Sequence, residues 1–224
     1  MGNTVGSRKN LIKRQKEILI GTLLGDGCLE KNGKNVRLRI DHGLNQKDYL
    51  DWKYKEFKNL ATNKPRMIKG MLHQETKKFY RRWHFSTFSF FELNDYWYKF
   101  YFQKRKRIPY NILELLKSSL SLAVWFMDDG YKRNDCNALR ISTDCFNIKE
   151  QRLLQECLKK NFKIRTNIHK KGKFWNIYIP SQEAKKFCRI IKPHILPSME
   201  YKIFFDPVTT ETLCRDSGYL VNRN

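Results

Sequence analysis

The feature that most constrains this chain is a short pattern that occurs twice. "LIGTLLGDG" occupies residues 19–27 and "LAVWFMDDG" occupies residues 122–130. Each runs from an apolar, helix-like stretch into aspartate and glycine, so that Asp26 and Asp129 stand at matching positions about a hundred residues apart. A repeat with this spacing predicts two structural units with the same order of elements.

The segment after the first motif predicts a hairpin, a helix, a second hairpin and another helix. Residues 28–43 alternate apolar and polar side chains around Asn32-Gly33, which is a typical turn sequence. A helix is expected from Asn45, and a second hairpin over about 66–88. Ser89 and Glu92 have the spacing of a capping box for the next helix.

The segment after the second motif repeats this order. A hairpin is expected over about 130–144, and Asn147 with Glu150 forms a cap pair for the helix that follows. A further hairpin is expected over about 164–179, with Gly172 at its turn, and Ser181 is a candidate cap for the last helix.

Each half therefore predicts an α+β unit with a four-stranded antiparallel sheet. The expected architecture is two pseudo-symmetric αββαββα repeats. The expected organisation is a flexible N-terminus over 1–10, an N-terminal repeat over 11–110, a C-terminal repeat over 111–205 and a tail over 206–224.

The charge of the chain favours a polyanionic partner. Lys and Arg number 45 against 22 Asp and Glu, which leaves a net charge of +23. Nucleic acid is the leading candidate. The alternatives are solubility alone or attraction to an anionic membrane surface. No apolar run approaches the roughly 20 residues that a membrane span needs, and the first residues have no secretory signal pattern.

Strand alternation predicts sheets with one apolar and one basic face. In "VRLRI", Val36, Leu38 and Ile40 would face the helices and the two arginines the other side. Such a face suits phosphates and base edges, although an ordinary solvated face is the alternative. The predicted nucleic-acid contacts are Arg37, Arg39, Lys69, Arg81, Arg82, Lys132, Arg140, Ser142, Arg165, Asn167, His169, Lys171 and Lys173.

The aspartates stand where a helix does not favour them. A carboxylate at a helix C-terminus meets the negative end of the dipole, so Asp26 and Asp129 need a nearby cation, and magnesium is a suitable one. The glycine after each aspartate is expected to stop the helix in the left-handed conformation. Gly21 and Gly25 form a small face that would pack against the other motif helix near Ala123. Two such helices would bring both carboxylates together, as two-metal phosphodiester hydrolysis requires.

These two motifs, and the hairpin and helix order after them, resemble the LAGLIDADG homing endonucleases of the single-chain, two-repeat, intron-encoded type. The resemblance covers about residues 11–205 and implies a saddle of two αββαββα units that straddles duplex DNA. It implies magnesium held by Asp26 and Asp129, with manganese expected to substitute. Asp128 falls where the family has a small residue, so its backbone carbonyl and that of Gly25 are the implied further ligands.

The resemblance also implies a lysine near each metal site. The matching residues are Lys106 in "KRKRIP" and Lys202 in "EYKI", and each could orient water or stabilise charge on the phosphate. Lys106 could equally be one more phosphate-binding residue in a basic run. Val124 stands where the motif has its glycine, so an asymmetric helix interface is expected.

The resulting functional prediction is a monomeric, magnesium-dependent, site-specific DNA endonuclease that makes a double-strand break in a long target and supports intron mobility. Two alternatives use the same fold without needing the carboxylates: an RNA maturase that assists intron splicing, with intron RNA as its partner, and a non-catalytic DNA-binding protein. An organelle, mitochondrion or chloroplast, is the expected location, and the bacterial cytoplasm is the alternative.

Overall fold

The computed structural model describes residues 10–72, 77, 79–172 and 174–203. Almost all of the predicted flexible N-terminus, the predicted tail over 206–224 and the predicted contact Lys173 lie outside these residues. A search of the described helices finds none with the length and apolar character needed to cross a membrane.

The first half contains three helices and a four-stranded antiparallel sheet. The sheet has the strand order β1-β2-β4-β3. The elements are α1 (Lys13–Leu24), β1 (Cys28–Asn32), β2 (Asn35–Gly43), α2 (Lys47–Glu56), β3 (Arg66–Leu72), β4 (Phe79–Ser86) and α3 (Glu92–Phe100), with a 3-10 turn, η1 (Leu44–Gln46), before α2.

The second half has the same order, and its sheet is β7-β8-β10-β9. Its elements are α5 (Ser119–Asp129), β7 (Gly130–Lys132), β8 (Leu139–Ser142), α6 (Ile148–Phe162), β9 (Asn167–Lys171), β10 (Phe174–Ile179) and α7 (Ser181–Ile191). Two 3-10 turns follow, η2 (Lys192–His194) and η3 (Pro197–Lys202), and the link between the halves holds β5 (Tyr101–Phe102), β6 (Arg105–Lys106) and α4 (Ile112–Leu115). The predicted fold class is confirmed.

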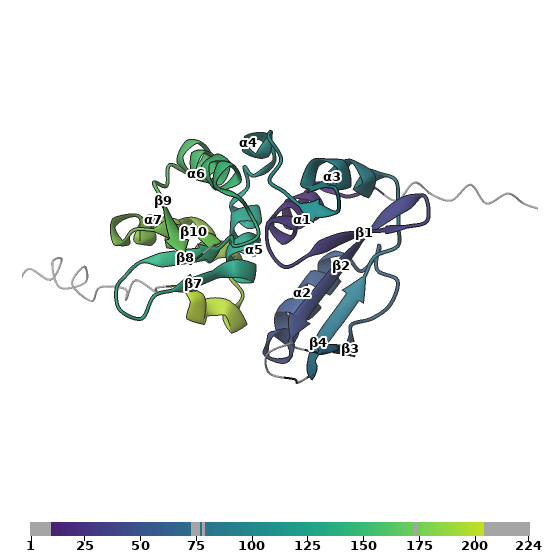
Figure 1. Cartoon of the computed structure of the whole chain (residues 1–224). Coiled ribbons are helices and arrows are strands. Elements are labelled where there is room, and N and C mark those ends of the chain that lie inside the picture. The colour runs from purple at the N-terminus through teal and green to yellow at the C-terminus, as the bar shows by residue number, and fades with distance from the viewer. Residues whose placement is uncertain (1–9, 73–76, 78, 173, 204–224) are drawn as a thin grey trace, which may run out of the picture.

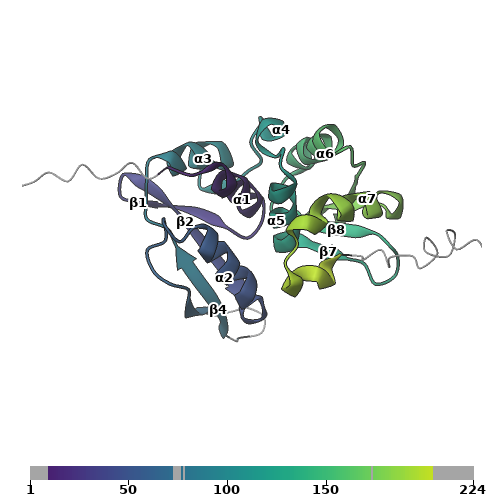
Figure 2. The ribbon, with the colours of Figure 1, turned by 180° about the vertical axis from the view of Figure 1, so that it is seen from behind.

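The two halves lie side by side, with α1 and α5 adjacent at the centre and one sheet on each flank (Figure 1). Seen from behind, α2 crosses the first sheet and α7 the second, so that helices cover one face of each (Figure 2). The predicted alternation is confirmed, because Val36, Leu38 and Ile40 are each at most 3% exposed. In the second sheet Leu139 and Ile141 take the same buried position.

The contact between α1 and α5 depends on glycine in one helix only. A Cβ on Gly21 would lie 2.4 Å from the carbonyl oxygen of Ser121 and 2.7 Å from Cβ of Val124. Val124 therefore fills the space that a second glycine would leave open. The expected asymmetry of the helix interface is confirmed, and the N-terminal motif supplies the close approach.

The predicted helix starts are right in one case and wrong in three. Asn147 and Glu150 form the expected capping box of α6, with bonds of 3.0 and 2.7 Å. Ser181 is instead the first residue of α7, after Pro180, and Asn45 lies in η1. Ser89 and Glu92 do not form the predicted capping box of α3, because the Glu92 carboxylate accepts a hydrogen bond from the chain that leads into α1.

Glu92 is used at the start of α1. Its carboxylate accepts the backbone N–H of Leu11 at 2.6 Å and pairs with the Lys16 ammonium at 2.8 Å. Leu11 is 81 residues away in the chain, so no local pattern could have shown this contact. The prediction for the motif glycines is also wrong. Gly130 has φ −82°, and a Cβ there would lie 2.2 Å from the Phe126 ring, so close packing rather than a left-handed backbone requires glycine.

Candidate active site

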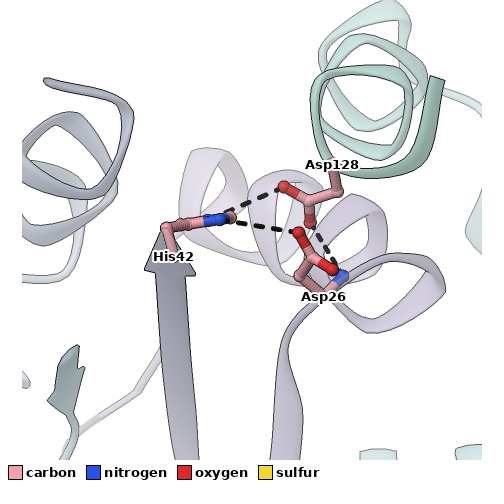
Figure 3. A group of neighbouring side chains, drawn as sticks. All are labelled: Asp26, His42 and Asp128. Carbon is pink, nitrogen blue, oxygen red and sulfur yellow. Dashed lines mark hydrogen bonds and ion pairs between the residues drawn. The ribbon is translucent and has the colours of Figure 1, made fainter. Parts of the chain in front are cut away.

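The ends of α1 and α5 meet between the two halves. Asp26 follows α1, and Asp129 is the last residue of α5. The backbone N–H of Asp26 donates to Oδ2 of Asp128 at 3.2 Å, which ties the end of one motif to the other (Figure 3). Asp26 and Asp129, the predicted catalytic and metal-binding aspartates, therefore come from opposite halves and lie at the same junction between them.

Both predicted metal-binding carboxylates have raised pKa values, despite the lysines near them. Burial, together with repulsion by Asp26 and Asp128, raises the pKa of Asp129 to about 8. Burial and repulsion by Asp128 raise the pKa of Asp26 to about 6, although 41% of its side-chain surface stays open to solvent. Among the described residues, no side chain donates a hydrogen bond to the Asp129 carboxylate. A cation between them would relieve this repulsion.

The two predicted lysines occupy equivalent positions beside the aspartates. The Lys106 ammonium donates to the carbonyl of Gly25 at 2.7 Å and to that of Gly27 at 2.8 Å. The Lys202 ammonium donates to the carbonyl of Met127 at 2.5 Å and to that of Asp128 at 3.1 Å. Burial lowers the pKa of both lysines.

Each lysine thus binds the carbonyl that precedes a motif aspartate. These are the carbonyls of Gly25 and Asp128, which the sequence suggested as metal ligands. A carbonyl oxygen has two lone pairs, so the lysine leaves one available. The cations also lie at helix C-termini, where they offset the dipole that disfavours the aspartates.

Asp128 differs from Asp129 because its counterion is part of the protein. Its side chain is fully buried, and the Lys53 ammonium donates to Oδ1 at 2.7 Å and to Oδ2 at 3.0 Å. Lys53 is itself fully buried and comes from α2 of the first half. The adjacent carboxylates therefore have different surroundings. Asp128 is paired with Lys53 inside the protein, whereas no described side chain donates a hydrogen bond to Asp129.

His42 is a third neighbour of these acids. Its Nδ1 lies 3.5 Å from Oδ2 of Asp26, and its Nε2 lies 3.8 Å from Oδ1 of Asp128. The ring projects from the end of β2 between the two carboxylates (Figure 3). It is 3% exposed, and burial lowers its pKa to about 3. Neither ring nitrogen makes a hydrogen bond to a described residue, and Gln46 lies nearby without the required geometry.

Sequence reasoning missed both His42 and Lys53, although each had a detectable signal. His42 continues the alternation of the buried side chains in "VRLRIDHG", so it belongs to the apolar face of the strand. Lys53 is four residues after Tyr49 on the buried face of α2. A basic residue at a core position needs a buried partner, and the acids of the two motifs were the candidates.

The donor set suits a divalent cation. Asp26, His42 and Asp128 offer ligand atoms within 4.8 Å of one another. That grouping by distance includes Asp128 rather than Asp129. Because Lys53 already neutralises Asp128, we take Asp26 and Asp129 as the better pair of oxygen ligands. Hard cations such as magnesium take carboxylate, carbonyl and water oxygen, all of which this site can present.

The predicted contacts on the first sheet are engaged in an ion-pair network. Arg37 and Arg39 both pair with Glu30, at 2.9 and 2.8 Å. Asp41 accepts from Arg39 at 2.9 Å and also contacts Arg82 at 3.3 Å. This face therefore carries less unpaired positive charge than its sequence suggested.

The second sheet presents a different face. Arg140, Ser142, Asn167 and His169 share one side by strand alternation and register. Tyr178 stacks on the His169 ring at 4.3 Å and lies 5.8 Å from the Arg140 guanidinium. Within the described residues no acid pairs with Arg140.

The remaining predicted contacts are more scattered. Lys69 and Arg81 are paired directly opposite each other in the register of β3 and β4. They alternate with Arg82, so they project from the side of the sheet that carries Phe85 and not from the side of Arg37. The other three are placed as follows: Lys132 ends β7, Lys171 ends β9, and Arg165 is exposed before β9.

The two halves, with central helices that each bring an aspartate to one shared site, define a class of two-repeat α+β proteins with an acidic site between the repeats. Residues 16–187 match the model of the LAGLIDADG DNA endonuclease family, and the chain belongs to that family.

Its relatives include endonucleases and maturases. The cytochrome b mRNA maturase bI2 of Debaryomyces hansenii is 30% identical over 209 residues, which cover 90% of this chain and 78% of the relative. The DNA endonuclease I-ChuI of Chlamydomonas applanata is 31% identical over 210 residues, which cover 87% and 96%. The solved structure of the homing endonuclease I-WcaI bound to its DNA recognition sequence matches with a TM-score of 0.81 and 25% identity, over 92% of this chain and 96% of that one.

Proposed function

We propose that this protein is a magnesium-dependent, site-specific DNA endonuclease that makes a double-strand break in a long target and thereby supports intron mobility. The observation that carries the proposal is the meeting of Asp26 and Asp129 at adjacent helix ends, each beside a lysine that donates to the preceding carbonyl. A protein that only bound nucleic acid would gain nothing from two carboxylates whose pKa values are raised to about 6 and about 8.

In this proposal Asp26 and Asp129 hold the divalent cations, with the carbonyls of Gly25 and Asp128 as further oxygen donors. Bound cations would activate water and stabilise the leaving oxygen, and manganese would substitute for magnesium. Lys106 and Lys202 would stabilise negative charge on the phosphate at either end of the site. Duplex DNA would lie along the two sheet faces, where Arg140 has no acidic partner among the described residues.

The central experiment removes one carboxylate from each half in turn. Asp26→Asn and Asp129→Asn should each lower the rate of double-strand cleavage about 1000-fold or more, because a catalytic cation contributes several kcal/mol. DNA binding measured in a chelator should stay within a few-fold of the parent. Asp135→Asn is the control, since Asp135 is a surface acid paired with Arg133. Full cleavage by Asp129→Asn would remove Asp129 from the mechanism.

RNA maturation is the second candidate, because the similarity to the maturase of Debaryomyces hansenii spans 90% of this chain. The two functions are separated by measuring the splicing of intron-containing transcripts in the presence of the parent protein and of Asp26→Asn. A maturase should keep its splicing activity without the carboxylate, whereas an endonuclease should lose cleavage.

The remaining parts of the proposal concern assembly and location. We propose a monomer with internal pseudo-twofold symmetry, with repeats over 11–110 and 111–205, because α1 and α5 already occupy each other's packing faces. An organelle is the proposed location, since cytochrome b mRNA is the stated substrate of one relative. Sedimentation of the free protein tests the first point, and localisation of a tagged copy tests the second.

A further inference from the structure

The two halves differ at the position that faces the motif aspartates. In the first half the buried alternation of β2 continues through Ile40 to His42. In the second half the same alternation continues from Ile141 to Thr143, whose hydroxyl donates to Gln151 at 2.8 Å. Thr143 is therefore a satisfied core residue, whereas both nitrogens of His42 lack a hydrogen-bond partner among the described residues.

The surroundings of His42 are unfavourable in every tautomer of the neutral ring. A neutral imidazole carries one hydrogen, so one of its nitrogens presents a lone pair. Nδ1 faces a carboxylate oxygen of Asp26 and Nε2 faces one of Asp128, so that lone pair meets another acceptor. A second ring proton would face the fully buried ammonium of Lys53, which already pairs with Asp128. An unpartnered imidazole in a buried site needs another positive partner.

The distance between His42 and Asp26 suits a shared metal ion. Nδ1 and Oδ2 are 3.5 Å apart, and a cation about 2.0–2.2 Å from each would have a nitrogen–metal–oxygen angle of about 105–122°. That range includes the tetrahedral angle. The Asp26 side chain is 41% exposed, so water or phosphate could complete the coordination from the open side. Asp128 is less suited as a ligand, because both of its oxygens contact the Lys53 ammonium.

We propose that Nδ1 of His42 and the carboxylate of Asp26 form a nitrogen–oxygen site for a transition-metal divalent cation such as Mn²⁺ or Zn²⁺. Among the described residues the Asp129 half-site has no equivalent imidazole, because Thr143 stands where the first half has His42. Imidazole favours transition metals over magnesium, so the two half-sites differ in the cation they prefer. The inference rests on the proposed function only for the metal-binding role of Asp26.

The test is metal binding by the full chain without DNA. Mn²⁺ bound to the parent protein should show ¹⁴N modulation in pulsed electron paramagnetic resonance, which reports a directly bound imidazole. His42→Gln should lose this modulation and bind Zn²⁺ at least about tenfold more weakly, in competition with a chromophoric chelator. His84→Gln is the matched control, since His84 also contacts a carboxylate in this sheet but is bonded to Asp41 at 2.5 Å. It should keep both properties.

Two results would overturn the inference. One is Mn²⁺ bound to the parent without nitrogen modulation, or no Mn²⁺ binding at all. The other is modulation that persists in His42→Gln. If His42→Gln does not fold, as judged by circular dichroism, histidine labelled with ¹⁵N in the parent chain gives the same readout. In that case Asp26→Asn should remove the coupling, and retention of the coupling would count against the site.

The outcomes separate this inference from the proposed function. Magnesium-dependent cleavage by a protein without nitrogen modulation would refute the His42 site and leave the endonuclease proposal standing. Nitrogen-coordinated Mn²⁺ in a protein that cuts no DNA, even when its intron flanks are supplied as target, would refute the endonuclease proposal and leave the His42 site standing.

Discussion

The two halves of the molecule share a backbone plan and one pair of equivalent contacts, but they differ in their buried polar residues. Lys106 binds the carbonyl before Asp26, and Lys202 binds the carbonyl before Asp129. Beneath the first sheet a charged pair, Lys53 with Asp128, is fully buried. In the second half Thr143, which takes the position of His42, is a neutral residue bonded to Gln151. The contacts that the halves share lie beside the proposed catalytic aspartates, whereas the buried pair of Lys53 and Asp128 occurs in one copy only.

The largest difference between the halves should appear when Lys53 is removed. Lys53→Met leaves Asp128 as an uncompensated buried charge and should lower the free energy of unfolding by about 3–5 kcal/mol. Urea unfolding followed by circular dichroism measures it. Lys160→Met in α6 is the control, because Lys160 is 60% exposed in its pair with Glu156 and should cost at most about 1 kcal/mol. Equal losses in the two variants would mean that the buried pair does not distinguish the halves.

The next effect concerns the helix contact, where Gly21 in α1 meets Val124 in α5. Gly21→Ala forces a methyl group against Val124 and should cost about 1–3 kcal/mol. Val124→Ala removes two buried methyl groups and should cost about 2 kcal/mol. Together they should cost less than the sum, because the second makes room for the first. Additive losses in urea unfolding would show that the clash is with the backbone of α5, at the Ser121 carbonyl and the Trp125 nitrogen, and not with the Val124 side chain.

These differences also mark how far the sequence could predict the structure. Repeated motifs and strand alternation were sufficient for the fold, because they depend on the spacing of apolar residues within each half. The Asn147–Glu150 cap was predictable because both bonds are local. Ser89 and Glu92 had the same spacing, but Glu92 binds the start of α1 instead. A local pattern cannot decide between partners that are close in the chain and partners that are close in space.

The candidate site shows the same limit. Each motif aspartate could be placed because it ends a helix whose packing face was visible in the sequence. The spacing of α2 predicts that Lys53 is buried, but it does not show which motif acid Lys53 meets, because the pair with Asp128 joins α2 of one half to α5 of the other. In the sequence His42 is only a strand residue near a turn. Its position beside Asp26 and Asp128 depends on how the two motif helices pack.

A smaller effect concerns the two open carboxylates and pH. The folded-state pKa of Asp129 is raised to about 8, so the folded protein holds this proton more tightly than the unfolded chain. Its stabilising contribution is complete below the unfolded value of about 4 and is lost as pH rises through about 8. Without metal, Asp129→Asn should therefore raise Tm at pH 8.5 by about 2–4 °C, as expected for about 1 kcal/mol, and change it little at pH 4.

Asp26→Asn should show a weaker form of this effect, because the pKa of Asp26 is raised only to about 6 and its side chain is 41% exposed. Added Mg²⁺ should raise the Tm of the parent at pH 8.5 and remove the advantage of Asp129→Asn. If the Tm of Asp129→Asn did not exceed that of the parent at pH 8.5 in a chelator, ionised Asp129 would not destabilise the folded protein.

The smallest expected effect compares the two sheet faces through the salt dependence of DNA binding. Arg140 has no acidic partner among the described residues, whereas Arg37 is paired with Glu30 at 2.9 Å. An arginine that neutralises a phosphate releases a counterion, and one already neutralised by a carboxylate releases less. Arg140→Gln should therefore reduce the slope of log K against log salt by about 1, and Arg37→Gln by less. Titration of labelled target duplex in a chelator at several salt concentrations measures both slopes. If Arg37→Gln changed the slope as much as Arg140→Gln, the Glu30 pair would have to open on DNA, and both faces would then contribute equally to phosphate binding.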